Sequence, residues 1–392
     1  MLKPIGSACN LQCKYCYYLE KKCLYNYREE NGYMSEQVLE SFIKQYLASQ
    51  TQQEVMFTWH GGEPLLLPIN FYKKALQLQK KHSKGYKIAN CIQTNGTLIT
   101  EDWCKFFKEN NWLVGVSIDG PEYLHNPFRI NKLGEPTFAK IMKGIELLNK
   151  YGVEWNAMAV VNNLNAEHPL EFYNFFKSIE CKYIQFTPIV ERIFQHPDGR
   201  TLSLPGEKGE GNLMEFSVGA EQFGKFTIAL FDEWIKNDVG EYFIQLFDST
   251  LANWVGVEPG VCSMAKECGH AGVMEKNGDL YSCDHYVFPE YKLGNIKEQP
   301  LLKMMYSPFQ SNFGAEKKSK LTKQCLECEY LFACNGGCPK DRFIKSCYGE
   351  DGQNYLCKGY KMYFEHVAPA MDFMKRELMN GRPARNVCGK VF

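Results

Sequence analysis

Three cysteines near the N-terminus limit what this chain can fold into more than any other feature. Cys9, Cys13 and Cys16 follow one another at intervals of four and three residues in the run CNLQCKYC. Thiolates are soft ligands that suit zinc and iron–sulfur clusters, and a structural zinc ion or a four-iron cluster normally takes four ligands. Cys23 is not at a regular ligand step. The trio therefore favours a cluster with one open iron; the plain alternative is a zinc knuckle or scattered buried thiols.

The C-x3-C-x2-C spacing, with the aromatic Tyr15 before the last cysteine, resembles the radical S-adenosyl-L-methionine (SAM) superfamily. The resemblance implies that the open iron binds the methionine part of SAM. An electron from the cluster then breaks a carbon–sulfur bond and yields a 5′-deoxyadenosyl radical. The cofactors carry this chemistry, and the protein positions them and excludes side reactions.

Composition excludes several classes of protein. The 392 residues suffice for two or three domains or one elaborated barrel. The 45 basic residues balance the 45 acidic ones, so we expect no nucleic-acid partner and no attraction to an anionic membrane. No apolar run reaches the ~18 residues of a membrane span. Seventeen cysteines without a secretory signal favour metal or redox use over disulfides, and hence a cytoplasmic location.

Expected strands and helices alternate through the first half of the chain. The strands are expected at residues 2–5, 54–59, 88–93, 113–118, 154–161 and 183–188. The helices are expected at residues 35–48, 71–82, 101–110, 138–151 and 170–179. Such alternation is typical of parallel βαβ units, and six units fall short of the eight of a closed barrel. The sequence therefore predicts an α/β fold, a partial (β/α)6 barrel.

Motifs follow several of these strands. Four motifs each come directly after an expected strand: the cysteine trio, HGGEP at 60–64, TNGT at 94–97 and DGP at 119–121. Chemistry in parallel sheets gathers at the C-terminal ends of the strands, so these motifs should face one mouth. The two glycines of HGGEP allow close backbone approach, and Glu63 offers an anionic acceptor for an ammonium group. A turn without a ligand is the alternative.

The superfamily resemblance extends to the residues that would bind SAM. The segment that matches HGGEP meets the amino group of SAM in that superfamily, and polar side chains near strand ends hold its ribose and carboxylate. An ordinary surface arginine is the alternative for Arg129. The resemblance implies SAM contacts by Tyr15, Gly62, Ser117, Arg129 and Val190.

The last third of the chain holds a second group of cysteines. The spacing C-x2-C-x5-C-x3-C from Cys325 to Cys338 fits one four-thiolate site, for which structural zinc is a serious alternative. Two four-cysteine sites account for more of the thiols. The layout resembles the SPASM-type extension, which holds two auxiliary four-iron clusters. The resemblance implies one cluster on Cys262, Cys268, Cys283 and Cys338, and the other on Cys325, Cys328, Cys334 and Cys357.

Six thiols stay outside these sets as ordinary cysteines, although Cys347 is an alternative to Cys357. They are Cys23, Cys91, Cys104, Cys181, Cys347 and Cys388.

Further elements are expected as helices at 220–236, 242–255 and 362–378, a hairpin at 273–283 and a loose tail from 380. Residues 192–212 are expected to form either a surface loop or a lid. We expect a barrel at 1–219, a helical connector at 220–258 and a cluster-binding domain at 259–392.

Several runs together resemble the anaerobic sulfatase-maturating enzymes: CNLQCKYCYY, GGEP, QTNGTLI, VGVSIDGP, GDLYSCDHYVF and NYLCKGY. His60 stands where glutamine is more usual. The resemblance implies oxidation of a cysteine or serine in a nascent or unfolded sulfatase, within a C/S-x-P-x-R motif, to Cα-formylglycine. The radical takes hydrogen from Cβ, Asp284 takes the proton as general base, and an auxiliary cluster accepts an electron.

The same resemblance implies three 4Fe–4S clusters, SAM and an electron donor such as flavodoxin or ferredoxin. Tyr18 is a candidate substrate contact, with simple packing as the alternative. Two other functions stay open: another SPASM-type enzyme that forms thioethers or crosslinks in peptides, and a non-catalytic zinc-binding interaction module. The sequence does not decide between cysteine and serine substrates.

Overall fold

The computed structural model describes residues 1–18, 21, 32–194, 201, 203–205, 207, 211–269 and 271–392. Cys23 and parts of the segment 192–212 lie outside the described residues. The chain forms two compact units. The first unit comprises Met1–Ile118, His125–Asn156 and His270–Phe313. The second unit comprises Asp119–Leu124, Ala157–Gly269 and Gly314–Phe392.

The first unit is built on a mixed sheet in which the N-terminal strand joins two parts of the chain. The strand order is β12-β11-β10-β1-β2-β3-β4. The neighbours β1 to β4 are parallel, β1 also pairs in parallel with β10, and the β10–β11–β12 meander is antiparallel. The strands are β1 (Leu2–Lys3), β2 (Glu54–Trp59), β3 (Lys87–Thr94), β4 (Leu113–Ser117), β10 (Val273–Glu275), β11 (Asp279–Tyr281) and β12 (Lys292–Asn295).

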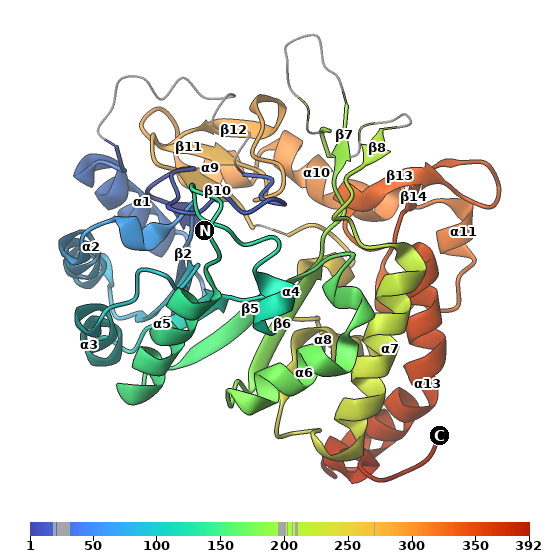
Figure 1. Ribbon diagram of the computed structural model, residues 1–392. Helices are drawn as coiled ribbons and strands as arrows, with labels where there is room; N and C mark the ends of the chain where they lie inside the picture. Colours follow the sequence, from blue (N-terminus) through green and yellow to red (C-terminus); the bar gives the residue numbers. More distant parts are fainter. Residues whose placement is uncertain are drawn as a thin grey trace. The chain divides into compact units, whose positions relative to one another are not determined.

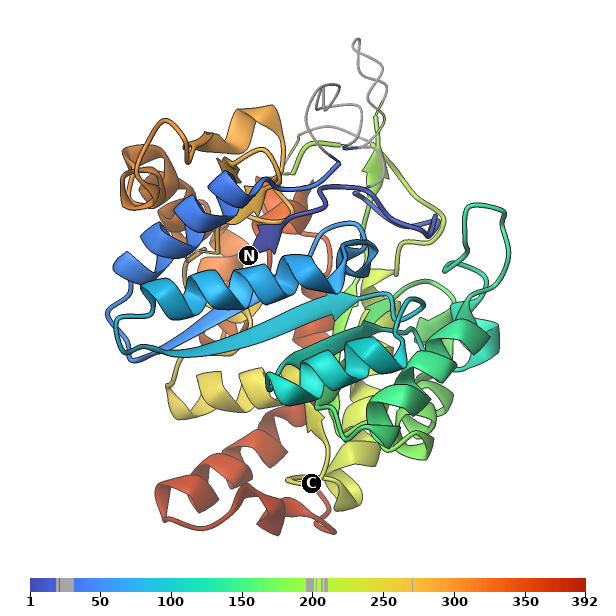
Figure 2. The same ribbon diagram turned by 90° about the vertical axis from the view of Figure 1, so that its left-hand side faces the viewer.

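Amphipathic helices cover these strands. Figure 2 shows α1, α2 and α3, in blue to teal, on the side of the strands that faces the viewer. The Ser35 hydroxyl caps α1 by accepting a hydrogen bond from the Val38 N–H at 3.3 Å, which satisfies a free backbone donor at the helix start. The helices are α1 (Glu36–Ala48), α2 (Ile69–His82), α3 (Glu101–Glu109), α5 (Phe138–Lys150) and α9 (Leu301–Met305).

The second unit contains the last parallel strands and the long C-terminal helix. Its strands β5, β6 and β9 pair in parallel in that order, and β7 pairs antiparallel with β8. The strands are β5 (Trp155–Val161), β6 (Tyr183–Pro188), β7 (Arg192–Ile193), β8 (Asn212–Leu213), β9 (Phe243–Ile244), β13 (Arg342–Lys345) and β14 (Asp351–Asn354). The helices are α6 (Pro169–Ser178), α7 (Ala220–Asn237), α8 (Gln245–Val255), α11 (Lys323–Leu326), α12 (Leu331–Cys334) and α13 (Cys357–Met379).

Helices α7 and α13 run side by side (Figure 1). Their contact needs glycine, because a Cβ atom at Gly359 would lie 2.0 Å from the Ala220 carbonyl oxygen. Two helices cross from one unit to the other along the chain, namely α4 (Glu122–His125) and α10 (Pro308–Ser319). Short 3-10 helices occur at Pro64–Leu66, Asn165–Glu167, Cys262–Met264, Pro289–Tyr291, Pro339–Asp341 and Ala384–Val387.

Every strand and helix expected before residue 188 is present, with ends within two residues of the expected positions. The helix expected at 242–255 is wrong at its start, where β9 forms because Ile244 pairs with Ile184 of β6. The helix expected at 362–378 begins earlier, at Cys357. The tail from residue 380 is not loose, since Glu377 accepts hydrogen bonds from Arg382 and Asn386.

In the described part of the chain, no helix has the length and apolar character needed to cross a membrane.

Candidate active site

The cysteine trio occupies the loop that follows β1 in the first unit. The Cys9 thiol accepts hydrogen bonds from the Leu11 N–H at 3.3 Å and from the Asn95 amide at 3.7 Å. Burial raises the pKa of the Cys9 thiol to about 11, and the neighbouring charge of Cys16 acts in the same direction. Hydrogen bonds to cysteine sulfur stabilise cluster thiolates and tune their potentials. The donors around Cys9 therefore suit a cluster ligand.

The segment 128–131 runs against this loop. The Gln12 N–H donates to the Ile130 carbonyl at 2.8 Å, and the Lys14 N–H donates to the Phe128 carbonyl at 2.9 Å. This pairing sets the Arg129 guanidinium 5.5 Å from the centre of the Tyr15 ring. Arg129 is buried. It is therefore not an ordinary surface arginine, which removes the alternative that the sequence left open.

The HGGEP segment packs directly on the cysteine loop. The Gly62 N–H donates to the Gly6 carbonyl at 2.7 Å, and the Glu63 N–H donates to the Ala8 carbonyl at 2.8 Å. A Cβ atom at Gly62 would lie 2.0 Å from the Ala8 oxygen. Only glycine permits this approach, so Gly62 sets the distance between HGGEP and the residue before Cys9.

Glu63 does not offer its carboxylate to a ligand, contrary to the sequence-based expectation. The side chain is fully buried. Its oxygens accept hydrogen bonds from the Leu65 N–H at 2.9 Å, the Thr94 hydroxyl at 2.7 Å and the Asn95 N–H at 2.7 Å. Burial raises the pKa of Glu63 to about 7, although these three donors oppose the rise. Glu63 thus ties HGGEP to TNGT.

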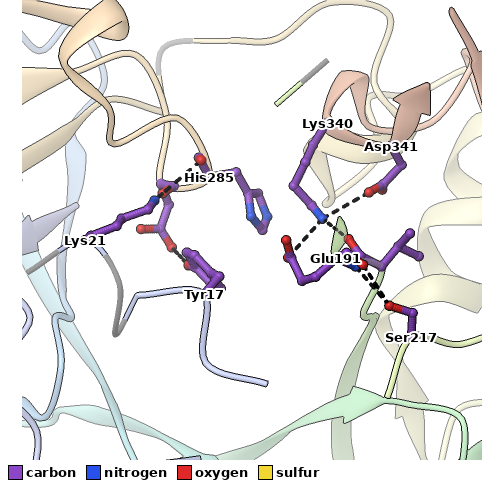
Figure 3. A network of polar contacts seen from close by, with 9 residues as sticks. Tyr17, Lys21, Glu191, Ser217, His285, Lys340 and Asp341 are labelled. Carbon is purple, nitrogen blue, oxygen red and sulfur yellow. Dashed lines mark hydrogen bonds and ion pairs between the residues drawn. The ribbon is translucent and has the colours of Figure 1, made fainter. Parts of the chain in front are cut away.

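The two other expected SAM contacts lie in different units. Ser117 ends β4 in the first unit, where its hydroxyl accepts a hydrogen bond from the Gln93 amide at 2.9 Å. Val190 follows β6 in the second unit and is buried. Its carbonyl oxygen accepts a hydrogen bond from Lys340 at 2.7 Å, and Lys340 also pairs with Glu191 at 3.2 Å and Asp341 at 3.0 Å (Figure 3).

Asp284 follows the hairpin β10–β11 in the first unit. Its carboxylate forms an ion pair with Lys3 and accepts a hydrogen bond from the Tyr17 hydroxyl at 2.7 Å. Burial opposes ionisation of Asp284, but Lys3, His60, His285 and Lys21 outweigh it and hold the pKa of the carboxyl far below its usual value. Asp284 is therefore an anion at neutral pH.

The backbone next to Asp284 is also held by a buried cation. Lys21 donates to the carbonyl oxygens of Asp284 at 3.3 Å and His285 at 3.5 Å (Figure 3). Tyr18 lies in the core beside Tyr281 and donates a hydrogen bond to Glu275. The Lys3 ammonium lies over its ring, 3.5 Å from the ring centre. Sequence reasoning missed Lys3 and Tyr17. A lysine inside an expected buried strand was the available signal for Lys3, because buried lysines need a partner.

The C-terminal cysteines of the second unit fall into two neighbourhoods. Burial raises the pKa of the Cys334 thiol to about 12, and the charges of Cys357, Cys325 and Cys328 add to the rise. The pKa of Cys268 is raised by burial and by Cys262, while Lys317 lowers it. Cys334 thus has Cys357, Cys325 and Cys328 as electrostatic neighbours, and Cys268 has Cys262. Cys283 lies in the first unit.

The remaining thiols differ in their surroundings. The Cys91 thiol donates to the Thr58 hydroxyl at 3.3 Å, and the Cys181 thiol donates to the Tyr183 carbonyl at 3.4 Å. Cys347 is exposed. Among the described residues, no three His, Cys, Asp or Glu side chains gather closely enough to hold a single metal ion.

Comparison with known proteins identifies the family. Residues 4–176 match the sequence model of the Radical SAM superfamily, and residues 268–329 match that of the SPASM iron–sulfur cluster-binding domain. The serine-type anaerobic sulfatase-maturating enzyme of Bacteroides thetaiotaomicron is 63% identical over 387 residues, which cover 99% of this chain and 93% of that enzyme. The chain belongs to the anaerobic sulfatase-maturating enzymes. It is a radical SAM enzyme that uses SAM and iron–sulfur clusters and converts a serine or cysteine of a sulfatase to formylglycine.

Other members of the family share both the sequence and the fold. The cysteine-type anaerobic sulfatase-maturating enzyme of Clostridium perfringens is 34% identical over 95% of this chain and 96% of that enzyme. The solved structure of native anSMEcpe with bound AdoMet has a TM-score of 0.83 and 33% identity, and it covers 96% of this chain and 98% of that chain. This similarity confirms the predicted α/β partial barrel with a cysteine-rich C-terminal extension.

Proposed function

We propose that this sulfatase-maturating enzyme acts on serine in preference to cysteine, within an S-x-P-x-R motif of a nascent or unfolded sulfatase. The carrying observation is the ionised Asp284, held by Lys3 and Tyr17 in the unit that also holds the cysteine trio. The preference for serine rests on the 63% identity to a serine-type enzyme, against 34% to a cysteine-type one. A solved relative carries AdoMet and the Cp18Cys peptide, which supports a peptide substrate here.

Cys9, Cys13 and Cys16 are proposed to hold the cluster that binds SAM. The hydrogen bonds to the Cys9 sulfur and the glycine-dependent approach of HGGEP support this role. When bound, the cluster and SAM supply the 5′-deoxyadenosyl radical that takes a hydrogen atom from the substrate Cβ.

The surrounding residues are proposed to orient SAM. Gly62 would meet its amino group, Arg129 its carboxylate and Ser117 its ribose. Tyr15, within the cysteine loop, is proposed as another SAM contact, and its ring also lies against the Arg129 guanidinium. The backbone at Val190 is proposed as a further contact, supported by its fixed carbonyl.

Asp284 is proposed as the general base. Removal of hydrogen from Cβ makes the substrate hydroxyl more acidic than an ordinary alcohol, and loss of the remaining electron makes it more acidic still. The ionised Asp284 carboxylate can therefore accept the proton as that electron leaves. Lys3 and Tyr17 fix the two carboxylate oxygens and keep the group ionised before the proton arrives. The proton moves from the substrate hydroxyl, or from the thiol of a cysteine substrate, to the Asp284 carboxylate. A cysteine substrate would give a thioaldehyde, which water would hydrolyse to the aldehyde with release of hydrogen sulfide.

Two auxiliary 4Fe–4S clusters are proposed beside the cluster of the cysteine trio, which makes three in all, and one of the two would take up the remaining electron. Their ligands would be Cys262, Cys268, Cys283 and Cys338 for one, and Cys325, Cys328, Cys334 and Cys357 for the other. The electrostatic grouping of Cys357 with Cys325, Cys328 and Cys334 supports Cys357 over Cys347. Replacing Cys283 with Ala should lower the iron content while leaving the first cluster able to form; unchanged iron would contradict this ligand set.

Three further parts of the proposal concern the setting of the enzyme. A flavodoxin or ferredoxin is proposed as electron donor, because the first cluster must be reduced before each SAM cleavage. The cytoplasm is the proposed compartment, since free thiols and clusters need reducing surroundings. We also propose three functional regions, which divide the chain differently from the two compact units. They are the barrel at 1–219, the helical connector at 220–258 and the cluster-binding domain at 259–392.

The test is an anaerobic assay of the reconstituted enzyme with reductant, SAM and three peptides. The peptides carry S-x-P-x-R, C-x-P-x-R and, as a matched control, A-x-P-x-R. Mass spectrometry should detect formylglycine together with 5′-deoxyadenosine, faster from serine than from cysteine. Faster conversion of cysteine would overturn the serine preference. Deoxyadenosine without aldehyde would instead favour a thioether- or crosslink-forming activity, and zinc without iron would favour the interaction module.

A further inference from the structure

Two buried cations in the second unit have no carboxylate partner. Lys317 lies on α10 and is 0% exposed, and Arg342 begins β13 and is 8% exposed. Among the residues that the structure describes, neither side chain forms an ion pair with Asp or Glu. Charged side chains are seldom buried unless they are paired, because the interior screens charge poorly and solvates it weakly. The described residues thus leave the positive charge of both side chains without a carboxylate to balance it.

Lys317 holds the loop between Cys262 and Cys268. Its ammonium donates hydrogen bonds to the carbonyl oxygens of Cys262 at 2.7 Å and Ser263 at 2.9 Å, and to that of Ala265. One turn earlier on α10, the Gly314 carbonyl accepts a hydrogen bond from the Cys268 N–H at 3.2 Å. A Cβ atom at Gly314 would lie 2.5 Å from the Cys268 oxygen. The helix is thus packed against the backbone of both cysteines.

Arg342 holds the loop between Cys334 and Cys338. Its guanidinium donates to the carbonyl oxygens of Gly336 at 3.0 Å and Asn335 at 3.1 Å. It also donates to the Lys317 carbonyl at 2.6 Å. The loop that it holds joins a proposed ligand of one auxiliary cluster to a proposed ligand of the other. Arg342 and Lys317 together therefore connect the backbones of both ligand sets.

The chemistry of the clusters supplies the missing anion. Four thiolates give a 4Fe–4S cluster a net negative charge, and reduction adds one more. Burial lowers the pKa values of both cations, and the nearby thiols oppose this: Cys268 and Cys338 act on Lys317, and Cys325 and Cys338 act on Arg342. Lys317 thus lies near thiols of one ligand set, and Arg342 lies near thiols of both. A positive charge close to a cluster favours its reduced state and raises its reduction potential.

We propose that Lys317 and Arg342 are the counter-charges of the two auxiliary clusters and raise their reduction potentials, so that these clusters accept the electron released during substrate oxidation. The inference rests on the proposed cluster ligands. The balance is complete: the deoxyadenosyl radical takes a hydrogen atom from Cβ, Asp284 takes the proton of the substrate hydroxyl, and one auxiliary cluster is reduced by one electron as the carbonyl forms. Both cations are positioning residues, because neither touches the substrate.

The test uses the full chain with Cys9, Cys13 and Cys16 all replaced by Ala, so that only the auxiliary clusters contribute to the spectrum. In this background, Lys317→Met and Arg342→Met remove each charge. Lys320→Met, one residue past the end of the same helix, and Lys345→Met on the same strand are matched controls, since these lysines are 66% and 73% exposed. Redox titration monitored by electron paramagnetic resonance gives the potentials, and iron and sulfide are counted in parallel.

We expect each charge-removing variant to make reduction of at least one auxiliary cluster about tenfold less favourable, a fall of ~59 mV for one electron. The two controls should leave both potentials in place. Iron-replete Lys317→Met and Arg342→Met proteins with unchanged potentials would overturn the inference and leave the proposed function intact.

The charge-conserving variants Lys317→Arg and Arg342→Lys decide the case in which charge removal causes iron loss. Clusters kept by the charge-conserving variants and lost by the neutral ones would support charge compensation. Equal loss in both pairs would assign the residues to backbone support and overturn the inference. A parent protein that binds no iron would refute the proposed ligand sets and the inference with them.

Discussion

Lys3 and Asp284 form a buried ion pair, although one lies in the first strand and the other follows the β10–β11 hairpin. The parallel pairing of β1 with β10, which sets Lys3 opposite Glu275, brings the two segments together. The buried ammonium of Lys3 also lies over the Tyr18 ring. Lys3 therefore joins the start of the chain, the residues after the cysteine trio and the proposed base.

Replacing Lys3 with Met should raise the pKa of Asp284, because burial then acts without its strongest opposing charge. Removing one partner of a buried ion pair costs about 3–5 kcal/mol. The folded pKa of Asp284 is depressed, so its stabilising effect is present above the usual Asp pKa and is lost as the pH falls. We expect the acid limb of formylglycine formation to move to higher pH. The exposed Lys87→Met change is the control, and an unmoved pH profile would contradict the role of Lys3.

Asp284→Asn should lose formylglycine far more than 5′-deoxyadenosine. A general base contributes about 10²–10⁴-fold in rate, whereas SAM cleavage does not require proton transfer to this residue. Both products are measured in one anaerobic assay by mass spectrometry, with the exposed Glu298→Gln change as control. Equal losses of the two products would place Asp284 in cofactor binding, and undiminished aldehyde would remove it from the mechanism.

Tyr17→Phe removes the hydroxyl that donates to Asp284 at 2.7 Å. A hydrogen bond to a charged group contributes about 1.5–3 kcal/mol, so formylglycine formation should fall by roughly 10–100-fold with less effect on SAM cleavage. The matched control is Tyr183→Phe, at an exposed tyrosine. A Tyr17→Phe enzyme as fast as the control would show that Lys3 alone orients the carboxylate.

Gly62→Ala should prevent assembly of the SAM site. The new methyl group would lie 2.0 Å from the Ala8 oxygen, so the HGGEP segment must move away from the cysteine loop. We expect loss of SAM binding by calorimetry and lower iron retention. Gly32→Ala is the control, because a Cβ atom there meets no atom of the described residues within 4 Å. Wild-type SAM affinity in the Gly62 variant would contradict the proposed close approach.

Glu63 should make the stability of the enzyme depend on pH between about 5 and 7. Its folded pKa of about 7 lies above the usual 4.5, so in this window the folded chain holds a proton that the unfolded chain has released. The contribution of Glu63 to stability therefore falls as the pH rises. Urea unfolding of wild type and Glu63→Gln at several pH values should give a smaller slope for the variant. Parallel slopes would contradict the raised pKa.

Much of the fold was readable from local pattern. The alternation of apolar strands and amphipathic helices before residue 188 depends on neighbouring residues, and its elements appear within two residues of their expected ends. The prediction from local pattern was wrong where a strand pairs with a distant part of the chain. Residues 243–244 form β9 instead of the first turn of a helix, because they pair with β6. The pairing partner lies far away in the sequence, so periodicity alone could not reveal it.

The sequence by itself determined the family, because thiol spacing and the runs around it carry the ligand chemistry, and the same runs predict the cysteine sets and the base that we propose. Only the tertiary structure decided what surrounds them. In the folded chain, Glu63 is buried and accepts three hydrogen bonds, and Lys3 pairs with Asp284. Lys317 and Arg342 donate hydrogen bonds to the backbone of the cysteine loops. Charge and hydrogen bonding act over a few ångströms in space, and residues far apart in the chain come within that range only when strands pair and helices pack.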